Sequence, residues 1–73
     1  MDTRAELLRL AIEAFDRGDL STVASILERS KYPIDHENAA NCRRLAVGGA
    51  SQMLQMQRSL LQQHLNMAET LGN

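Results

Sequence analysis

The sequence predicts an all-helical fold, in which a short helical hairpin is followed by one long amphipathic C-terminal helix and two copies pair as a helical homodimer. Apolar residues recur at helical spacing in three segments, and no segment alternates apolar and polar residues as a strand would. Each segment is also preceded by a residue that commonly caps helices. With 73 residues, the chain has room for a single domain, residues 1–73.

The first helix is predicted over about residues 4–17. Thr3 and Glu6 have the spacing of a capping box, in which each side chain accepts a hydrogen bond from a free backbone amide of the first turn. Gly18 suits the left-handed position that ends a helix.

The second helix is predicted over about residues 20–31, with Asp19 or Ser21 as its cap. It is expected to stop near Lys31, because Pro33 disfavours helical geometry at the residue before it.

The third helix is predicted over about residues 36–71, with Asp35 as its cap and Ile34 and Ala39 placed as a hydrophobic staple. Its apolar residues fill one continuous half of a helical wheel, and this phase passes unchanged through Gly48-Gly49. We therefore predict one continuous helix, either straight or bent at the glycine pair. About 36 residues would make a rod of about 54 Å, longer than the roughly 30 Å diameter of a compact chain of this size.

A rod that overhangs its own domain, with an apolar arc wider than a surface helix needs, predicts a second copy as its cover. Methionines on this face also suit an adaptable partner-binding surface. Its other face is poor in charge and rich in glutamine, which favours association. The predicted dimer and partner interface comprises Ala46, Gly49, Ala50, Met53, Met56, Leu60, His64, Met67 and Leu71. The glutamines predicted for the polar face are Gln52, Gln55, Gln57, Gln62 and Gln63.

Charge and composition exclude several classes of partner. The formal net charge of −1 argues against general nucleic-acid binding, which depends on clustered basic residues. No apolar run approaches the roughly 18 residues of a membrane span, so no membrane partner is expected. A single cysteine suits a cytoplasmic protein. A candidate patch for an acidic partner flanks the second connection and consists of Arg29, Lys31, Arg43 and Arg44.

No catalytic, metal or cofactor site is predicted. Cys42 lies on the apolar face and is expected to be a small buried residue, although a position near a helix start could also activate a thiol. His36 and His64 are too far apart in sequence for a local metal-ligand motif. His36 is expected in an exposed first turn, and His64 is either a register-setting polar residue or a pH-sensitive contact.

Two local patterns resemble known motifs. Ala14, Gly18, Val23 and Ala24 resemble the small residue, turn glycine and buried aliphatic residues of a helix-turn-helix. The stretch from Phe15 through Ala24 to Leu27 also resembles a single tetratricopeptide hairpin. The segment Ile26-Leu-Glu-Arg-Ser-Lys-Tyr32, between a short helix and an acidic cap, resembles the Hha/YmoA family of small nucleoid modulators. That resemblance implies an all-helical protein that acts by binding a nucleoid protein.

The function expected from these features is non-enzymatic: a dimeric regulatory protein, such as an antiactivator, inhibitor or adaptor, that binds another protein through its apolar helical surface. The first alternative is a small secretion chaperone that shields a helix of its client. A nucleoid-protein modulator or a helix-turn-helix-like DNA-binding regulator is the further alternative.

Overall fold

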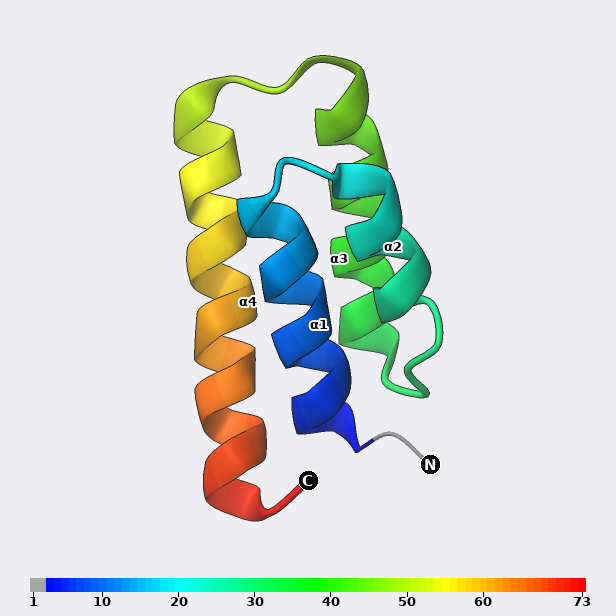
Figure 1. The fold of residues 1–73 in the computed structure, drawn as a ribbon, viewed down its shortest axis with the longest axis vertical. Coiled ribbons are helices and arrows are strands. Elements are labelled where there is room, and N and C mark those ends of the chain that lie inside the picture. The colour runs from blue at the N-terminus through cyan, green and yellow to red at the C-terminus, as the bar shows by residue number, and fades with distance from the viewer. Residues whose placement is uncertain (1–2) are drawn as a thin grey trace.

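The computed structural model describes residues 3–73 and shows four helices in that range, with no strand. They are α1 (Arg4–Asp16), α2 (Leu20–Leu27), α3 (Pro33–Gly48) and α4 (Ser51–Leu71). The chain runs up, down, up and down through them, so that neighbours in sequence are antiparallel (Figure 1). The all-helical prediction is confirmed, and helices account for 82% of the described chain.

The first hairpin follows its local signals. Thr3 and Glu6 form the predicted capping box at the start of α1. Gly18 takes the predicted left-handed conformation, with φ 79°. Asp19, not Ser21, caps α2 by accepting a hydrogen bond from the backbone amide of Thr22.

The prediction that the second helix reaches residue 31 is wrong, because α2 ends at Leu27. The chain then tightens into a turn in which the amide of Ser30 bonds the carbonyl of Leu27. The hydroxyl of Ser30 accepts a hydrogen bond from the amide of Tyr32 at 3.1 Å. A side chain that bonds nearby backbone in this way competes with continued helix.

The predicted start of the third helix is also wrong. Tyr32 is the N-cap of α3 and Pro33 occupies its first position, where the missing amide of proline costs nothing. Asp35 is therefore inside the first turn and is not the cap. Its side chain points inward and is 1% exposed. Ile34 lies inside the same turn and is partly exposed, so the predicted staple with Ala39 does not describe this helix start.

The predicted continuous helix over residues 36–71 is wrong as well. Gly49 and Ala50 are extended, and α4 folds back beside α1 (Figure 1). A Cβ on Gly49 would lie 2.5 Å from Cδ2 of Leu45, so only glycine fits this turn without displacement. The longest dimension of the molecule is 34 Å. Within residues 3–73, no helix of about 54 Å overhangs the domain, so a second copy is not needed to cover one.

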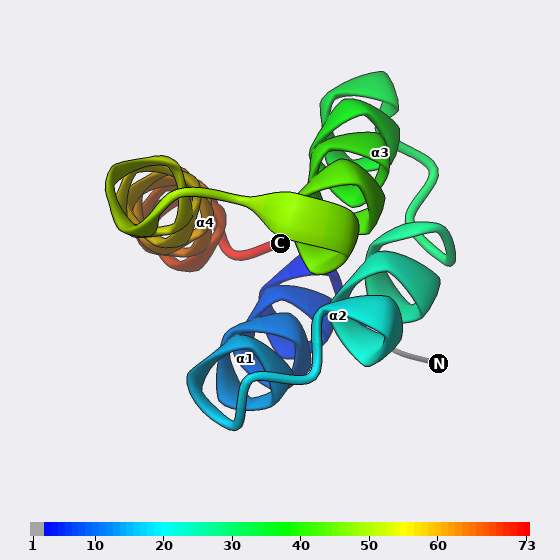
Figure 2. The same cartoon turned by 90° about the horizontal axis from the view of Figure 1, so that it is seen from above.

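The core lies between α1 and the helices on either side of it. α1 packs against both α2 and α4, and α2 packs against α3, whereas α3 and α4 make the least contact of the packed pairs. Viewed from above, α3 and α4 stand apart on one side of the bundle (Figure 2). Small side chains let the other helices approach closely. The largest fully buried apolar residues are Leu8, Val23, Leu27, Cys42 and Leu61, and the alanines with no exposure are Ala11, Ala14, Ala24, Ala39 and Ala68.

Candidate functional site: an apolar stripe and groove on α4

An exposed apolar stripe runs along α4. It contains most of the predicted interface residues on this helix. Two of its members, Met56 and Leu71, have side chains that are 67% and 70% exposed. We call the set Met53, Met56, Leu60, Met67 and Leu71 the α4 stripe, all of whose members are at least 40% exposed. The other predicted interface residues lie elsewhere: Ala46 is exposed near the end of α3, Gly49 and Ala50 form the turn, and His64 is half-buried.

The stripe exists because the apolar arc of α4 is wider than its contact with the core. One part of the arc packs inward through Leu61, Leu65 and Ala68, which are at most 7% exposed. The other part stays uncovered within the described chain. A surface helix needs an apolar stripe of only about 100°, so the width of the arc remains a reason to expect a partner.

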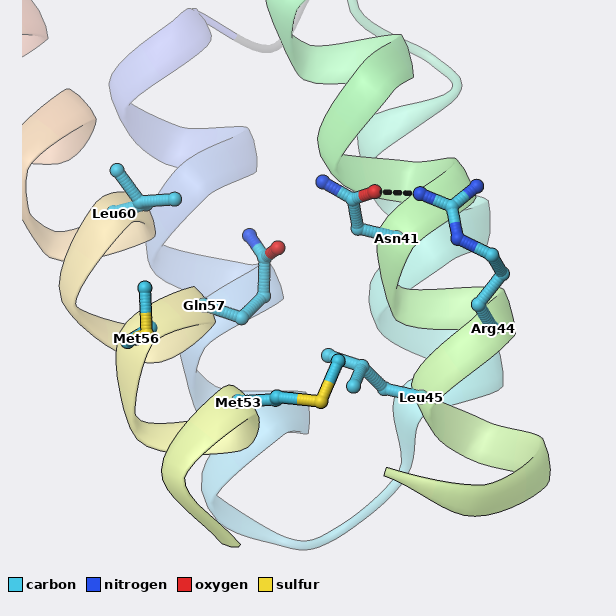
Figure 3. Close-up of a pocket in the computed structure, with 7 residues that line it drawn as sticks. All are labelled: Asn41, Arg44, Leu45, Met53, Met56, Gln57 and Leu60. Carbon is cyan, nitrogen blue, oxygen red and sulfur yellow. Dashed lines mark hydrogen bonds between the residues drawn. The ribbon is translucent and has the colours of Figure 1, made fainter. Parts of the chain in front are cut away.

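A groove of about 290 Å³ separates the exposed side of α4 from α3 (Figure 3). The side chains of Met53 and Leu45 point toward one another from opposite walls at one end of it. Arg44 lies on the α3 wall and donates a hydrogen bond to the side-chain oxygen of Asn41. The complete lining, which we call the α3–α4 groove, is Asn41, Arg44, Leu45, Met53, Met56, Gln57 and Leu60.

The groove has one polar point in its floor. Gln57 was predicted on the exposed polar face, but it is 4% exposed and donates a hydrogen bond to Oδ1 of Asn38 at 3.2 Å. Asn38 is also buried, and its Nδ2 atom has no hydrogen-bond partner among residues 3–73. Since an unpaired buried donor costs about 1–3 kcal/mol, this pair is a weak point in the packing of α3 against α4.

The predicted basic patch is divided between two places. Arg43 forms an ion pair with Glu28 at 2.7 Å, and Arg29 and Lys31 lie in the connection between α2 and α3. Arg44, in contrast, lines the groove. The acidic-partner patch stays a prediction.

A buried polar network lies at the other end of the bundle. Arg4 donates two hydrogen bonds to the carboxylate of Asp35, at 2.9 and 3.0 Å, and its guanidinium lies 4.7 Å from the ring centre of Tyr32. Ser30 donates to the same carboxylate at 2.6 Å, and Nδ1 of His64 lies 3.2 Å from Arg4. Burial alone would raise the pKa of Asp35, but the hydrogen bonds from Arg4 and Ser30 and the positive charge of Arg4 outweigh it, so this pKa is lowered. The network ties α1 and α4 to the start of α3.

The remaining candidate residues show no reactive arrangement. Cys42 is fully buried, and burial raises the pKa of its thiol to about 11, which is the opposite of activation. His36 is exposed in the first turn of α3, where its ring contacts the carbonyl of Ser30. Within residues 3–73, no group of three or more potential ligands is placed to hold a metal ion. None of the helices in that range combines the length and apolar character needed to cross a bilayer.

Sequence reasoning missed the residues that α3 contributes to the groove as a set. No sequence pattern marked Asn41 or Leu45 as interface residues, and Arg44 was predicted to belong to the patch for an acidic partner. The missing information was the fold-back at Gly49, which places α3 opposite the exposed side of α4. No protein-family model, curated protein or solved structure matches this chain, so its function is argued from the geometry of this surface.

Proposed function

We propose that this protein is a small non-enzymatic interaction module, and that it acts as a dimeric regulatory protein that binds another protein through its apolar helical surface. The observation that supports this proposal is the α4 stripe, five large apolar side chains that are 40–70% exposed along one helix. Scattered exposed apolar residues are ordinary, but a contiguous apolar surface marks an interaction site.

The size of the stripe suggests how strong self-association would be. Full burial of a Leu or Met side chain contributes about 1.5–3 kcal/mol. Five side chains that are on average about half exposed therefore contribute roughly 4–9 kcal/mol per copy when covered. Association itself costs about 4–15 kcal/mol. The gain and the cost are of the same order, so the stripe supports a weak dimer that exchanges for another partner rather than a permanent one.

Two substitutions test the proposal. Met53→Glu and Leu60→Glu place a charge in the α4 stripe, and each should shift the chain to a monomer in light scattering over micromolar to millimolar concentrations. Gln55→Glu is the matched control, because it adds the same charge to an exposed position of α4 outside the stripe. Circular dichroism establishes that each variant remains helical. An oligomer unchanged by Met53→Glu and Leu60→Glu, or a wild-type chain that is monomeric throughout, would overturn the dimeric part of the proposal.

A further inference from the structure

We infer that the α3–α4 groove binds an amphipathic helix of another protein, and that this helix carries a carboxylate beside its apolar face. The inference rests on the proposed function, since it names the chemistry of the partner that the apolar surface takes. It depends on three observations: the shape of the groove, the charge on its α3 wall and the absence of a matching surface on a second copy.

The groove has the dimensions of a short stretch of helix. Its α4 wall extends from Met53 to Leu60, and these two residues are about 10.5 Å apart along the helix axis. This length matches side chains at positions i, i+3 or i+4, and i+7 of a bound helix. Met53 and Met56 are flexible and can adapt to the side chains that enter. Leu45 supplies an apolar contact from the opposite wall.

Arg44 determines the charge of the partner. The exposed arginines Arg9, Arg43 and Arg58 each form an ion pair with a carboxylate of this chain. Arg44 has no such pair among residues 3–73, and it donates instead to the amide oxygen of Asn41. Because its guanidinium lies on the wall of an apolar groove, a carboxylate on the bound helix would form a charge-assisted, bidentate contact there.

A second copy of the chain does not supply this combination. Of the described helices, α4 has the most exposed large apolar side chains, those of the α4 stripe, and the acidic residue of α4 is Glu69. The exposed large apolar residues of the other helices are Leu10 on α1 and Ile34 and Val47 on α3. Glu69 is outside the stripe and is paired with Arg9. A second copy would match the apolar wall but would leave Arg44 without a carboxylate. Since Met53, Met56 and Leu60 belong to both surfaces, the partner helix competes with the second copy for them.

The test uses displayed 18-residue helices with Leu, Met or Ala at the apolar positions and Glu, Gln or Lys at the flanking positions. Selection against the full-length protein should enrich helices with Glu next to the apolar face. Selection against Arg44→Glu should enrich Lys at that position, and Glu-bearing helices should lose at least about tenfold in affinity for this variant because attraction becomes repulsion. Arg17→Glu, which reverses an exposed charge away from the groove, should leave the preference for Glu unchanged.

The outcomes separate this inference from the proposed function. Helices that depend on Met53 but show no preference for charge, or a preference that Arg44→Glu does not reverse, would overturn the inference and leave apolar docking standing. No enrichment against a protein that forms the α4-dependent dimer would also overturn it. If the wild type is monomeric but selects Glu-bearing helices that Arg44→Glu rejects, the inference stands and only the dimer is lost.

Discussion

The ion pair between Arg4 and Asp35 joins the first turn of α1 to the first turn of α3, across 31 positions of sequence. A carboxylate is tolerated in the interior only when a charge and donors meet it there. Asp35 meets both, since Arg4 and Ser30 donate hydrogen bonds to it. Asp35 therefore fixes the start of α3 through tertiary contacts instead of through capping.

Removing the charge of Asp35 should strongly destabilise the fold. Asp35→Asn leaves Arg4, whose side chain is 10% exposed, as an uncompensated charge in the interior, which costs about 3–5 kcal/mol. A domain of this size has a total free energy of unfolding of only about 4–11 kcal/mol. Arg9→Gln, which removes the half-exposed pair with Glu69, should cost less than about 1 kcal/mol. Urea denaturation of both variants measures the difference, and equal losses would contradict the role assigned to the buried pair.

The lowered pKa of Asp35 also predicts how stability depends on pH. Above the ordinary aspartate pKa of about 3.9, the carboxylate is ionised in both states and its stabilising contacts are complete. As the pH falls below that value, the unfolded chain takes up the proton first, so stability falls until the lower pKa of the folded state has been passed. The free energy of unfolding of the wild type should therefore fall steeply below about pH 4, and Asp35→Asn should show a shallower fall. Asp16→Asn is the control, because the pKa of Asp16 is lowered by its hydrogen bond to Arg58 but its side chain is exposed.

At the scale of helices, the sequence predicted the first hairpin better than the connections that follow it. The capping box at Thr3, the left-handed Gly18 and the cap at Asp19 are short-range signals, and the structure confirms all three. The end of α2 and the start of α3 depend on the hydroxyl of Ser30, which bonds both Tyr32 and Asp35. A serine that joins two segments in this way has no pattern of its own in the sequence.

The turn between α3 and α4 should respond differently to alanine at its two glycines. Gly49→Ala places a Cβ 2.5 Å from Cδ2 and 3.2 Å from Cα of Leu45, and such overpacking costs about 1–3 kcal/mol. Gly48 is the last residue of α3 and has open space around it. Gly48→Ala should be neutral or stabilise the helix by up to about 1 kcal/mol. Thermal unfolding of the two variants tests this, and it would count against the described turn if both behaved alike.

At the scale of the whole molecule, the helical phase was read correctly but the path of the chain was not. A periodic pattern from residue 39 to residue 71 is compatible both with one rod and with two helices that turn back, because each places the same residues on one side of its axis. The choice depends on two contributions to the stability of the fold. One is the packing of Leu61, Leu65 and Ala68 of α4 in the core beside α1, and the other is the continuation of the helix through two more residues. That comparison involves contacts between distant segments, which periodicity does not contain.

Because periodicity contains no contacts between distant segments, the sequence predicted only the part of the candidate site that lies on α4. The large apolar side chains on α4 were identified because their number exceeds what one packed face can cover, and the structure leaves them exposed. The groove was missed because three of its seven lining residues come from α3, and only the turn at Gly49 brings that helix opposite α4.

The brevity of the connection after Gly48 has a consequence for assembly. Only Gly49 and Ala50 lie between α3 and α4. If these two residues adopted helical φ and ψ angles, α3 and α4 would join into one continuous helix. The detached α4 would then pack against α1 of a neighbouring molecule, and the α4 helix of that molecule would pack against α1 of the first, as in a domain swap. Reciprocal exchange of this kind preserves every core contact in a twofold entwined pair, and the barrier to it is set by the two residues of the hinge.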